Sequence, residues 1–323
     1  MNWGVVFPGQ GSQTPGMGHY LYENFKSARL RFEEASDAIH LDFKKLCFTG
    51  SEEELKLTEN TQPALLLVSI ATLDALNEIS DFKPTAAAGH SVGEYAALVG
   101  AKTLRFTDAV KAVRLRGQAM QKAVPVGEGG MCAVMGMTDD QVREACQWVE
   151  KTSDLKPLEP ANFNSPGQVV VSGSEKAVTW LCENFKKEAL KNPPTRAKFI
   201  PLKVSAPFHC SLMKPAEEVM RAHLETVQLS DAIYPVVQNF TASPTRSASE
   251  LRENLIRQIS SPVLWTGCVE KLRDLNCLKL IEAGPGKVLS GLVKKIDSEA
   301  FQTFNLNSLE DLKAVETELT RKI

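Results

Sequence analysis

The 323-residue sequence lacks several features that mark particular classes of protein. Its formal net charge is −2, so it has no basic excess of the kind that binds nucleic acid or an anionic membrane surface. Its seven cysteines are an odd number and form no CxxC pair, which favours reduced thiols over a disulfide framework or a zinc site. We therefore expect no nucleic-acid partner and no bound metal.

Long hydrophobic runs are also missing. The first residues, MNWGVVFPGQG, have neither the basic region nor the apolar stretch of a secretory signal. The most apolar helix-like run, 64–76, is too short to span a bilayer and contains Ser69, Thr72 and Asp74. With 43% hydrophobic and 24% charged residues, the composition is that of an ordinary globular protein. We expect a cytoplasmic protein without a membrane partner.

Strand-like and helix-like segments alternate in the first part of the chain, which predicts a parallel sheet covered by helices. After Gly127 the order becomes strand, helix, strand, strand, helix, strand, which is the ferredoxin-like arrangement. We predict an α/β fold: a large α/β-hydrolase-like subdomain with a parallel sheet, formed by residues 1–126 and 204–323. A smaller ferredoxin-like subdomain, 127–203, is inserted into it.

The stretch GHSVG, residues 89–93, follows a predicted strand and precedes a helix of small residues. A G-x-S-x-G pattern at a strand-to-helix turn is the nucleophile elbow, in which glycines relieve crowding around a strained serine. The start of the helix would also direct backbone N–H groups at the site of attack, as an oxyanion hole requires. The alternative is a glycine-rich packing turn. We interpret Ser91 as a nucleophile.

A serine nucleophile needs a base, and the chain has five histidines. His209 lies in the loop SAPFHCS, between a predicted strand and a helix, where catalytic groups often lie. His90 adjoins the serine, but neighbouring side chains at a sharp turn diverge, so we expect it to be a structural neighbour. We therefore predict His209 as the base, although no acidic residue is an obvious partner to orient it.

Arg116, in the segment VRLRGQAMQ, allows two interpretations. On a helix it could be a surface charge. It could also reach the pocket from the helix that follows the elbow, where its planar fork would bind a carboxylate. Spacing alone leaves both open.

The glycine-rich segments do not match nucleotide-binding motifs. PGQGSQ has Thr14 where the third glycine of G-x-G-x-x-G would stand. GPGKV has Ile281 in place of the first P-loop glycine and Val288 in place of its Ser or Thr. We therefore predict no cofactor.

Seven segments occur together in one order: FPGQGSQ, GHSVGEY, LRGQAMQ, NFNSPGQVVVSG, APFHCSLMKPA, RQISSPVLW and EAGPGKVL. With this set the whole chain closely resembles the malonyl-CoA:acyl carrier protein transacylases of type II fatty acid synthesis, with polyketide synthase acyltransferase domains as similar relatives. The resemblance implies transfer of malonyl from malonyl-CoA to the phosphopantetheine thiol of acyl carrier protein, for fatty acid biosynthesis. It also implies a covalent ester, ping-pong kinetics, no separate cofactor and a monomer.

The resemblance also implies roles for particular residues. Ser91 and His209 form the catalytic dyad, and Arg116 binds the malonyl carboxylate. The backbone N–H groups of Gln10 and Val92 form the oxyanion hole. Val92 stands where the family often has Leu, which matters little because the backbone acts.

Four further positions follow from the same resemblance. The backbone carbonyl of Gln258 orients the histidine, which would replace the missing acid. Asn162 and Asn164 face the acyl–pantetheine cleft. Phe208 stands where many bacterial enzymes have Ser and resembles the malonyl-selective pattern of polyketide acyltransferases, since a ring would crowd an α-methyl branch.

Three alternatives remain beside this prediction. The chain could be a discrete acyltransferase that acts in trans for a polyketide synthase. It could be a Ser–His thioesterase or editing hydrolase, although a carboxylate clamp does not suit general esters. It could also be a non-catalytic module that docks carrier proteins, against which the intact Ser91, His209 and Arg116 argue.

Overall fold

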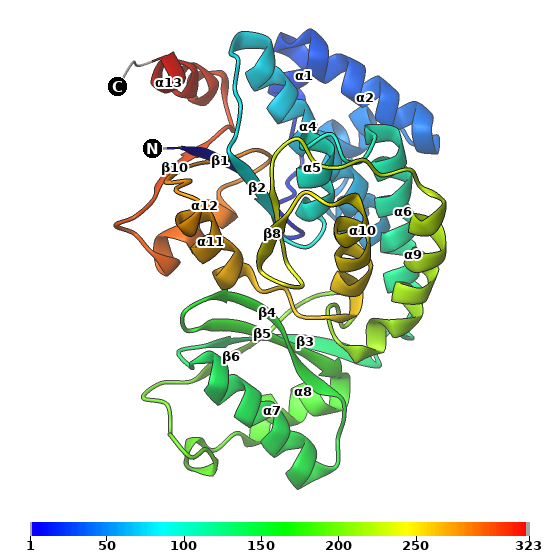
Figure 1. Ribbon diagram of the computed structural model, residues 1–323. Helices are drawn as coiled ribbons and strands as arrows, with labels where there is room; N and C mark the ends of the chain where they lie inside the picture. The colour runs from blue at the N-terminus through cyan, green and yellow to red at the C-terminus, as the bar shows by residue number, and fades with distance from the viewer. Residues whose placement is uncertain (1, 321–323) are drawn as a thin grey trace.

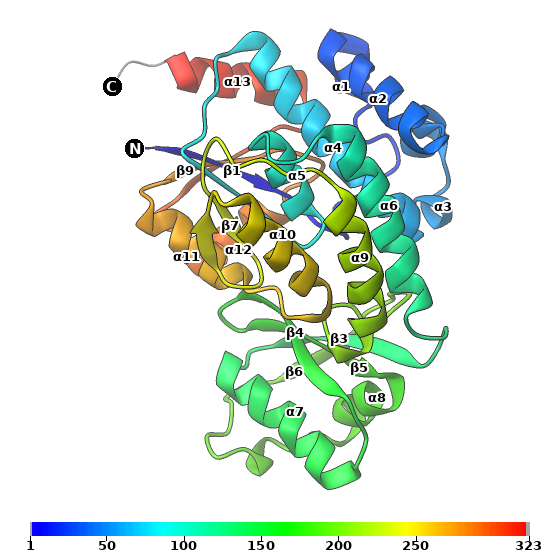
Figure 2. The same ribbon diagram turned by 45° about the vertical axis from the view of Figure 1, so that its right-hand side comes forward.

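A computed structural model describes residues 2–320, and it contains two parts that are each built on their own β-sheet. Figure 1 shows the larger part above the smaller one, and Figure 2 shows the same division after rotation. Strand β1 and helix α13 lie on the same side of the large part, so the two ends of the described chain are close to each other. The mixed α/β fold predicted from the sequence is confirmed.

The large part has a six-stranded sheet in the order β10-β9-β1-β2-β7-β8. Its strands are β1 (Trp3–Phe7), β2 (Ala86–Gly89), β7 (Val236–Gln238), β8 (Ser243–Thr245), β9 (Lys279–Glu282) and β10 (Gln302–Asn305). All neighbours are parallel except β7 and β8. Strands β8 and β10 were not predicted, because the sequences SPT and QTFN carry no apolar run.

Helices cover the large sheet on both faces (Figure 1). They are α1 (His19–Asn24), α2 (Lys26–Ile39), α3 (Glu52–Lys56), α4 (Thr58–Ile79), α5 (Gly93–Gly100), α6 (Phe106–Lys122), α9 (Lys214–Thr226), α10 (Ala248–Arg257), α11 (Trp265–Asp274), α12 (Val288–Ile296) and α13 (Leu309–Thr320). None of the helices in residues 2–320 is long and apolar enough to cross a membrane.

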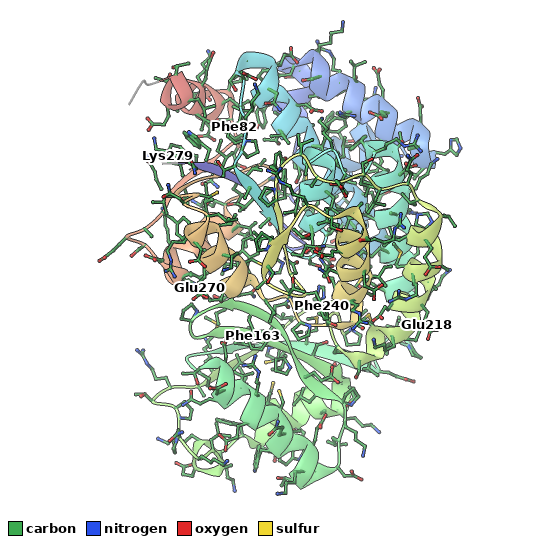
Figure 3. The ribbon with its side chains drawn as sticks, in the orientation of Figure 1. Phe82, Phe163, Glu218, Phe240, Glu270 and Lys279 are labelled. Carbon is green, nitrogen blue, oxygen red and sulfur yellow. The ribbon has the colours of Figure 1, made fainter. Side chains whose placement is uncertain are left out.

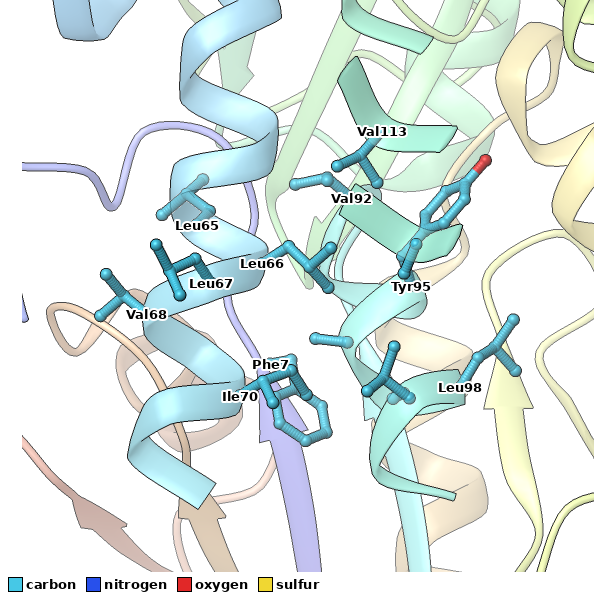
Figure 4. Close-up of a cluster of buried hydrophobic side chains, with 14 of the residues drawn as sticks. Phe7, Leu65, Leu66, Leu67, Val68, Ile70, Val92, Tyr95, Leu98 and Val113 are labelled. Atoms are coloured by element: carbon cyan, nitrogen blue, oxygen red, sulfur yellow. The ribbon is translucent and has the colours of Figure 1, made fainter. Parts of the chain in front are cut away.

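Helix α4 is buried on nearly all sides, which explains why its sequence is apolar with little periodicity. Figure 4 shows its Leu66 directed toward α5, near Val92 and Tyr95, with Phe7 at the end of β1 below. Burying one leucine of this kind contributes about 1.5–3 kcal/mol. This cluster fixes α5, and with it the turn that precedes α5, against the carboxyl end of the sheet.

The small part has a four-stranded antiparallel sheet in the order β4-β5-β3-β6. Its elements are β3 (Gly129–Met135), α7 (Asp139–Ser153), β4 (Leu158–Ser165), β5 (Gln168–Ser174), α8 (Glu175–Asn184) and β6 (Lys198–Pro201). This chain order and strand order are those of the predicted ferredoxin-like arrangement. Helices α7 and α8 cover one face, and the opposite face is turned to the large part (Figure 1).

Backbone hydrogen bonds join the two parts directly. The N–H of Phe163 in β4 donates to the carbonyl of Val263 at 2.9 Å, and the N–H of Val263 donates to Ala161 at 2.9 Å. In Figure 3 Phe163 lies below this boundary and Phe240 above it, and both line a groove of about 490 Å³. Strand β4 is therefore attached to the segment that leads from α10 into α11.

Candidate active site

The turn at residues 89–93 has the strained geometry expected of a nucleophile elbow. Ser91 has a φ of 52°, in the left-handed region that a residue with a Cβ rarely adopts. A Cβ on Gly89 would lie 2.0 Å from the carbonyl carbon of Gly93, and a Cβ on Gly93 would lie 2.2 Å from the oxygen of Phe7. Both glycines are therefore required by close backbone contacts, and the turn presents Ser91 between β2 and α5.

His209 is in hydrogen-bond contact with this serine. The distance from Ser91 Oγ to His209 Nε2 is 2.8 Å, and His209 Nδ1 lies 2.9 Å from the backbone oxygen of Gln258. A carbonyl only accepts, so Nδ1 carries the proton and Nε2 presents a lone pair to the serine hydroxyl. Burial, and next the charge of Arg116, lower the pKa of His209 to about 3. The imidazole is thus neutral near pH 7, the form a general base requires.

Arg116 is buried, with 1% of its surface exposed, so it is not a surface charge. Its Nη1 donates to Gln62 Oε1 at 2.7 Å, and its Nη2 donates to Gln258 Oε1 at 2.9 Å and to Ser91 Oγ at 3.1 Å. Its Nε is buried without a hydrogen-bond partner, and within residues 2–320 no carboxylate lies within 4.0 Å of the guanidinium. A buried cation without a counter-ion is costly. The guanidinium is therefore prepared for an anion from outside the chain.

A cavity of about 290 Å³ opens in front of the serine, between the two parts of the molecule. From the large part it is lined by Gln10, Gln62, His90, Ser91, Arg116, Met120, Phe208 and His209, together with Val204. From the small part it is lined by Met131, Ala133, Asn162, Asn164, Gln168, Val170 and Leu202. Seven of the nine predicted site residues line this cavity; Val92 and Gln258 are not among the lining residues.

The backbone N–H groups of Gln10 and Val92 are available to a ligand, since neither donates to a protein acceptor within residues 2–320. The Gln10 side chain is fixed by neighbours: Thr58 Oγ1 donates to Gln10 Oε1 at 3.0 Å, and Gln62 Nε2 donates to Thr58 Oγ1 at 3.0 Å. Gln62 in turn accepts from Arg116. One hydrogen-bonded chain therefore connects the first loop of the protein with the buried arginine.

His90 contacts the small part and not the serine hydroxyl. Its Nε2 lies 2.8 Å from Asn164 Oδ1, so Nε2 donates, and its ring packs at 5.5 Å from that of Trp265. Burial lowers the pKa of His90. Asn162, also in β4, is buried beside the bridge to Val263. The interpretation of His90 as a structural neighbour agrees with this geometry.

Three residues around the serine were not singled out from the sequence: Gln62, Glu94 and Asn239. Asn239 Oδ1 accepts from the Ser91 N–H at 2.7 Å, and its Nδ2 donates to the Gly89 oxygen at 2.7 Å. Asn239 directly follows β7, which is parallel to β2 and adjacent to it. Polar residues just after parallel strands gather at one edge of the sheet, so this position could have been found. The side chain of Gln258, which reaches Arg116 and Ser91, was also missed.

The described residues contain no group of three or more His, Cys, Asp or Glu side chains that could hold a metal ion. The polar groups at the cavity are instead a hydroxyl, a neutral imidazole, a guanidinium and two free N–H groups. This set can form an ester on Ser91 from an activated acyl donor, stabilise the oxyanion and bind a negative charge on the acyl group. The fold and the site define a Ser–His acyl transferase.

Comparison with known proteins supports that class and narrows it. The family model of the acyl transferase domain matches residues 5–302 of this chain, so the chain belongs to the acyl transferase family. It is 44% identical over 292 residues to the malonyl CoA-acyl carrier protein transacylase of Bacillus subtilis (strain 168), covering 90% of this chain and 89% of that one. The resemblance to these transacylases noted from the motifs is thereby confirmed.

Two solved structures share the fold over nearly the whole chain. The acyl-carrier-protein S-malonyltransferase of Burkholderia pseudomallei 1710b is 39% identical, with a TM-score of 0.90 over 98% of this chain and 100% of that chain. A malonyl-transacylase in complex with a type II PKS acyl-carrier protein is also 39% identical, with a TM-score of 0.91 and the same coverage.

Proposed function

We propose that the protein transfers a malonyl group from malonyl-CoA to the phosphopantetheine thiol of acyl carrier protein, through an ester on Ser91. The observation that carries the proposal is the buried guanidinium of Arg116, which makes no direct ion pair within residues 2–320 and lies 3.1 Å from the Ser91 hydroxyl. A cation so close to the nucleophile suits a short acyl group that ends in a carboxylate. The names of the similar proteins point to the same substrates.

In the first half-reaction, Ser91 Oγ attacks the thioester carbonyl of malonyl-CoA while His209 Nε2 accepts its proton. The negative charge that develops on the carbonyl oxygen is stabilised by the N–H groups of Gln10 and Val92. Collapse of this intermediate breaks the carbon–sulfur bond, and His209 returns the proton to the leaving coenzyme A thiolate. The malonyl group stays on Ser91.

The second half-reaction runs the same steps in reverse with a different thiol. The phosphopantetheine thiol gives its proton to His209 and attacks the ester, and Ser91 leaves with the proton. Because the malonyl group stays on Ser91 while coenzyme A leaves before the second thiol attacks, the kinetics are ping-pong. The Gln258 carbonyl holds the His209 tautomer throughout, so the site needs no acidic third member and no cofactor.

Arg116 acts on the far end of the acyl group. Its Nη2 exchanges the hydrogen bond to Ser91 Oγ for one to the malonyl carboxylate, while Gln62 and Gln258 continue to hold the guanidinium plane. This exchange releases the serine lone pair as the correct substrate binds. Phe208, also at the cavity, would crowd an α-methyl branch and so favour malonyl over methylmalonyl.

The test is to mix the protein with malonyl-CoA, with and without phosphopantetheinylated acyl carrier protein, and to measure acyl-enzyme, acyl carrier protein product and free malonate. We expect one malonyl group on Ser91 and its passage to the carrier. Dominant release of malonate at saturating carrier would favour the thioesterase alternative. An absence of any adduct would favour the docking module.

The acceptor pathway is proposed on the same basis. We assign the protein to fatty acid biosynthesis, as a cytoplasmic monomer. One similar structure holds a type II PKS carrier protein, so service to a polyketide synthase is the second candidate. Comparing kcat/KM for fatty acid and polyketide carrier proteins from the same cell separates the two.

A further inference from the structure

Glu94 is a buried carboxyl group that the mechanism above does not use. It lies in the first turn of α5, three positions after Ser91, and is 0% exposed. Its Oε2 accepts from the backbone N–H of Asn239 at 2.7 Å, and its Oε1 accepts from Gln238 Nε2 at 3.1 Å. Burying a carboxyl group is unfavourable, so its retention beneath the elbow calls for a role.

The contacts of Asn239 connect this carboxyl to the nucleophile. While Glu94 holds the Asn239 backbone, the Asn239 side chain holds the elbow on the amino-terminal side of the serine, at the Ser91 N–H and the Gly89 carbonyl. Gln258 Nε2 donates to the Ser91 carbonyl at 3.1 Å and to Asn239 Oδ1 at 3.3 Å. Asn239 and Gln258 thus hold the backbone of the strained serine by hydrogen bonds, and the carboxylate of Glu94 holds Asn239 in turn.

The charged and titratable groups that face Glu94 come from three elements. Arg116 on α6 stabilises its charge, Tyr95 lies on its own helix, and Cys268 lies on α11. Burial raises the pKa of Glu94 to about 7, against the opposing effects of its hydrogen bonds and of Arg116. Since His209 has a pKa near 3, Glu94 is the group at this site that changes charge near neutral pH.

We propose that Glu94 is a positioning residue for the transfer reaction: its carboxylate fixes Asn239, which holds the Ser91 turn so that Oγ meets His209 and the Val92 N–H meets the oxyanion. The inference rests on the proposed function, because it concerns the same serine. It assigns to Glu94, the glutamate of the GHSVGE segment, a role that does not depend on direct contact with the acyl group.

Two consequences distinguish this role from others. A loosened elbow misplaces Oγ for every acyl group, so loss of the carboxylate slows malonyl and acetyl transfer alike. Protonated Glu94 no longer accepts from both donors, so the acylation rate of the native protein rises with pH through about 7. The titrating group in that limb is Glu94 and not the catalytic histidine.

The experiment compares Glu94→Gln with Glu282→Gln by rapid mixing with malonyl-CoA and acetyl-CoA across pH 5.5 to about 9, together with thermal unfolding. Glu282 is the matched control: it is also 0% exposed, and its carboxylate is also held by hydrogen bonds, in this case from the backbone N–H groups of Leu289 at 2.9 Å and Ser290 at 2.8 Å. Its partners lie at the start of α12. A glutamine at position 94 has nearly the same size as glutamate. Its amide NH₂ group cannot accept a hydrogen bond, so it would face one of the two donors that now bind the Glu94 carboxylate.

We expect Glu94→Gln to lower the acylation rate constant about 10- to 100-fold for both acyl groups, with little change in KM. The rise of the acylation rate with pH near 7, which we call the pH limb, should be absent from this variant. Glu282→Gln keeps the native rate and the limb below its unfolding temperature. Asn239→Ala, which retains Glu94 but removes its connection to Ser91, gives the same equal loss and serves if Glu94→Gln does not fold.

The inference is overturned if folded Glu94→Gln keeps the native rate or the native pH limb. It is also overturned if only malonyl transfer falls, because Glu94 would then act through the charge of Arg116. Equal losses in Glu94→Gln and Glu282→Gln would reduce its role to general stability. If the native protein forms no acyl-enzyme at all, the proposed function fails instead, and the two failures are distinguishable.

Discussion

The two sheets contribute different things to one cavity. The groups that would touch the reacting atoms, Ser91, His209 and Arg116, all come from the part with the parallel sheet. The part with the antiparallel sheet supplies a wall made of the apolar side chains of Met131, Ala133, Val170 and Leu202 and the amides of Asn162 and Asn164. The chemical groups are therefore placed by a strained turn between β2 and α5, and the opposite wall bounds the cavity in front of them.

The two parts should also differ in how well they tolerate amino-acid substitutions. Around Ser91 the backbone is packed so closely that two glycines have no room for a Cβ, and the Ser91 N–H, the Ser91 carbonyl and the Gly89 carbonyl each have a hydrogen-bond partner. Asn164 in the wall of the small part is hydrogen-bonded to His90 of the elbow, and β4 is joined to the large part by the bridge to Val263. We expect substitutions in the large part to abolish transfer and substitutions in the wall to modulate it.

The largest expected effect is that of Ser91→Ala. Without the hydroxyl no ester forms, and turnover falls by about 10⁴-fold or more. Intact-mass measurement after mixing with malonyl-CoA would show the native adduct and none in the variant. A malonyl group that persists on another residue of the variant would contradict the assignment of Ser91 as the nucleophile. If that residue lay in the small part, it would also contradict the view that only the large part carries the chemistry.

Arg116→Ala comes next and should discriminate between acyl groups. Removing the partner of a buried carboxylate costs about 2–5 kcal/mol, so malonyl transfer should fall about 10²- to 10³-fold, while acetyl transfer is spared or improved. The matched control is Arg114→Ala on the same helix, because Arg114 is partly exposed and donates to the Glu59 carbonyl at 2.9 Å. Equal losses for malonyl and acetyl in Arg116→Ala would contradict the carboxylate clamp.

Much of this site could be predicted from local patterns. The turn at Ser91 and the loop at His209 each follow from a few neighbouring residues, and the order of strands and helices indicated both sheets. Arg116 could not be decided, because whether its side of α6 is buried depends on packing against α4, which supplies Gln62. The partners Glu94 and Asn239 are 145 positions apart and meet only because β2 and β7 are neighbours in the sheet.

A substitution in the wall tests the other half of the comparison. Asn164→Ala removes the acceptor for His90 Nε2 and one amide of the cavity, but it leaves the dyad untouched. We expect kcat/KM for transfer to the carrier protein to fall about 2- to 10-fold, chiefly through KM, since a hydrogen bond of this kind contributes about 0.5–1.5 kcal/mol. The rate of acylation at saturating malonyl-CoA should stay near native. A loss as large as that of Arg116→Ala would mean that the wall takes part in the chemistry.

The smallest effect on malonyl transfer itself is expected at Phe208, which lies next to the catalytic base yet faces the same cavity as the wall. Phe208→Ser removes the ring that would crowd a branched acyl group, and one methyl group in a pocket is worth about 1–3 kcal/mol. The ratio of kcat/KM for methylmalonyl-CoA over malonyl-CoA should therefore rise about 10-fold, with malonyl transfer itself changed little. The measurement is competition between the two donors for one carrier protein. An unchanged ratio would mean that the wall from the small sheet, and not the loop that carries His209, sets the limit on acyl shape. A rise would place selectivity on the large part together with the chemistry and leave the small part to accommodate the pantetheine arm.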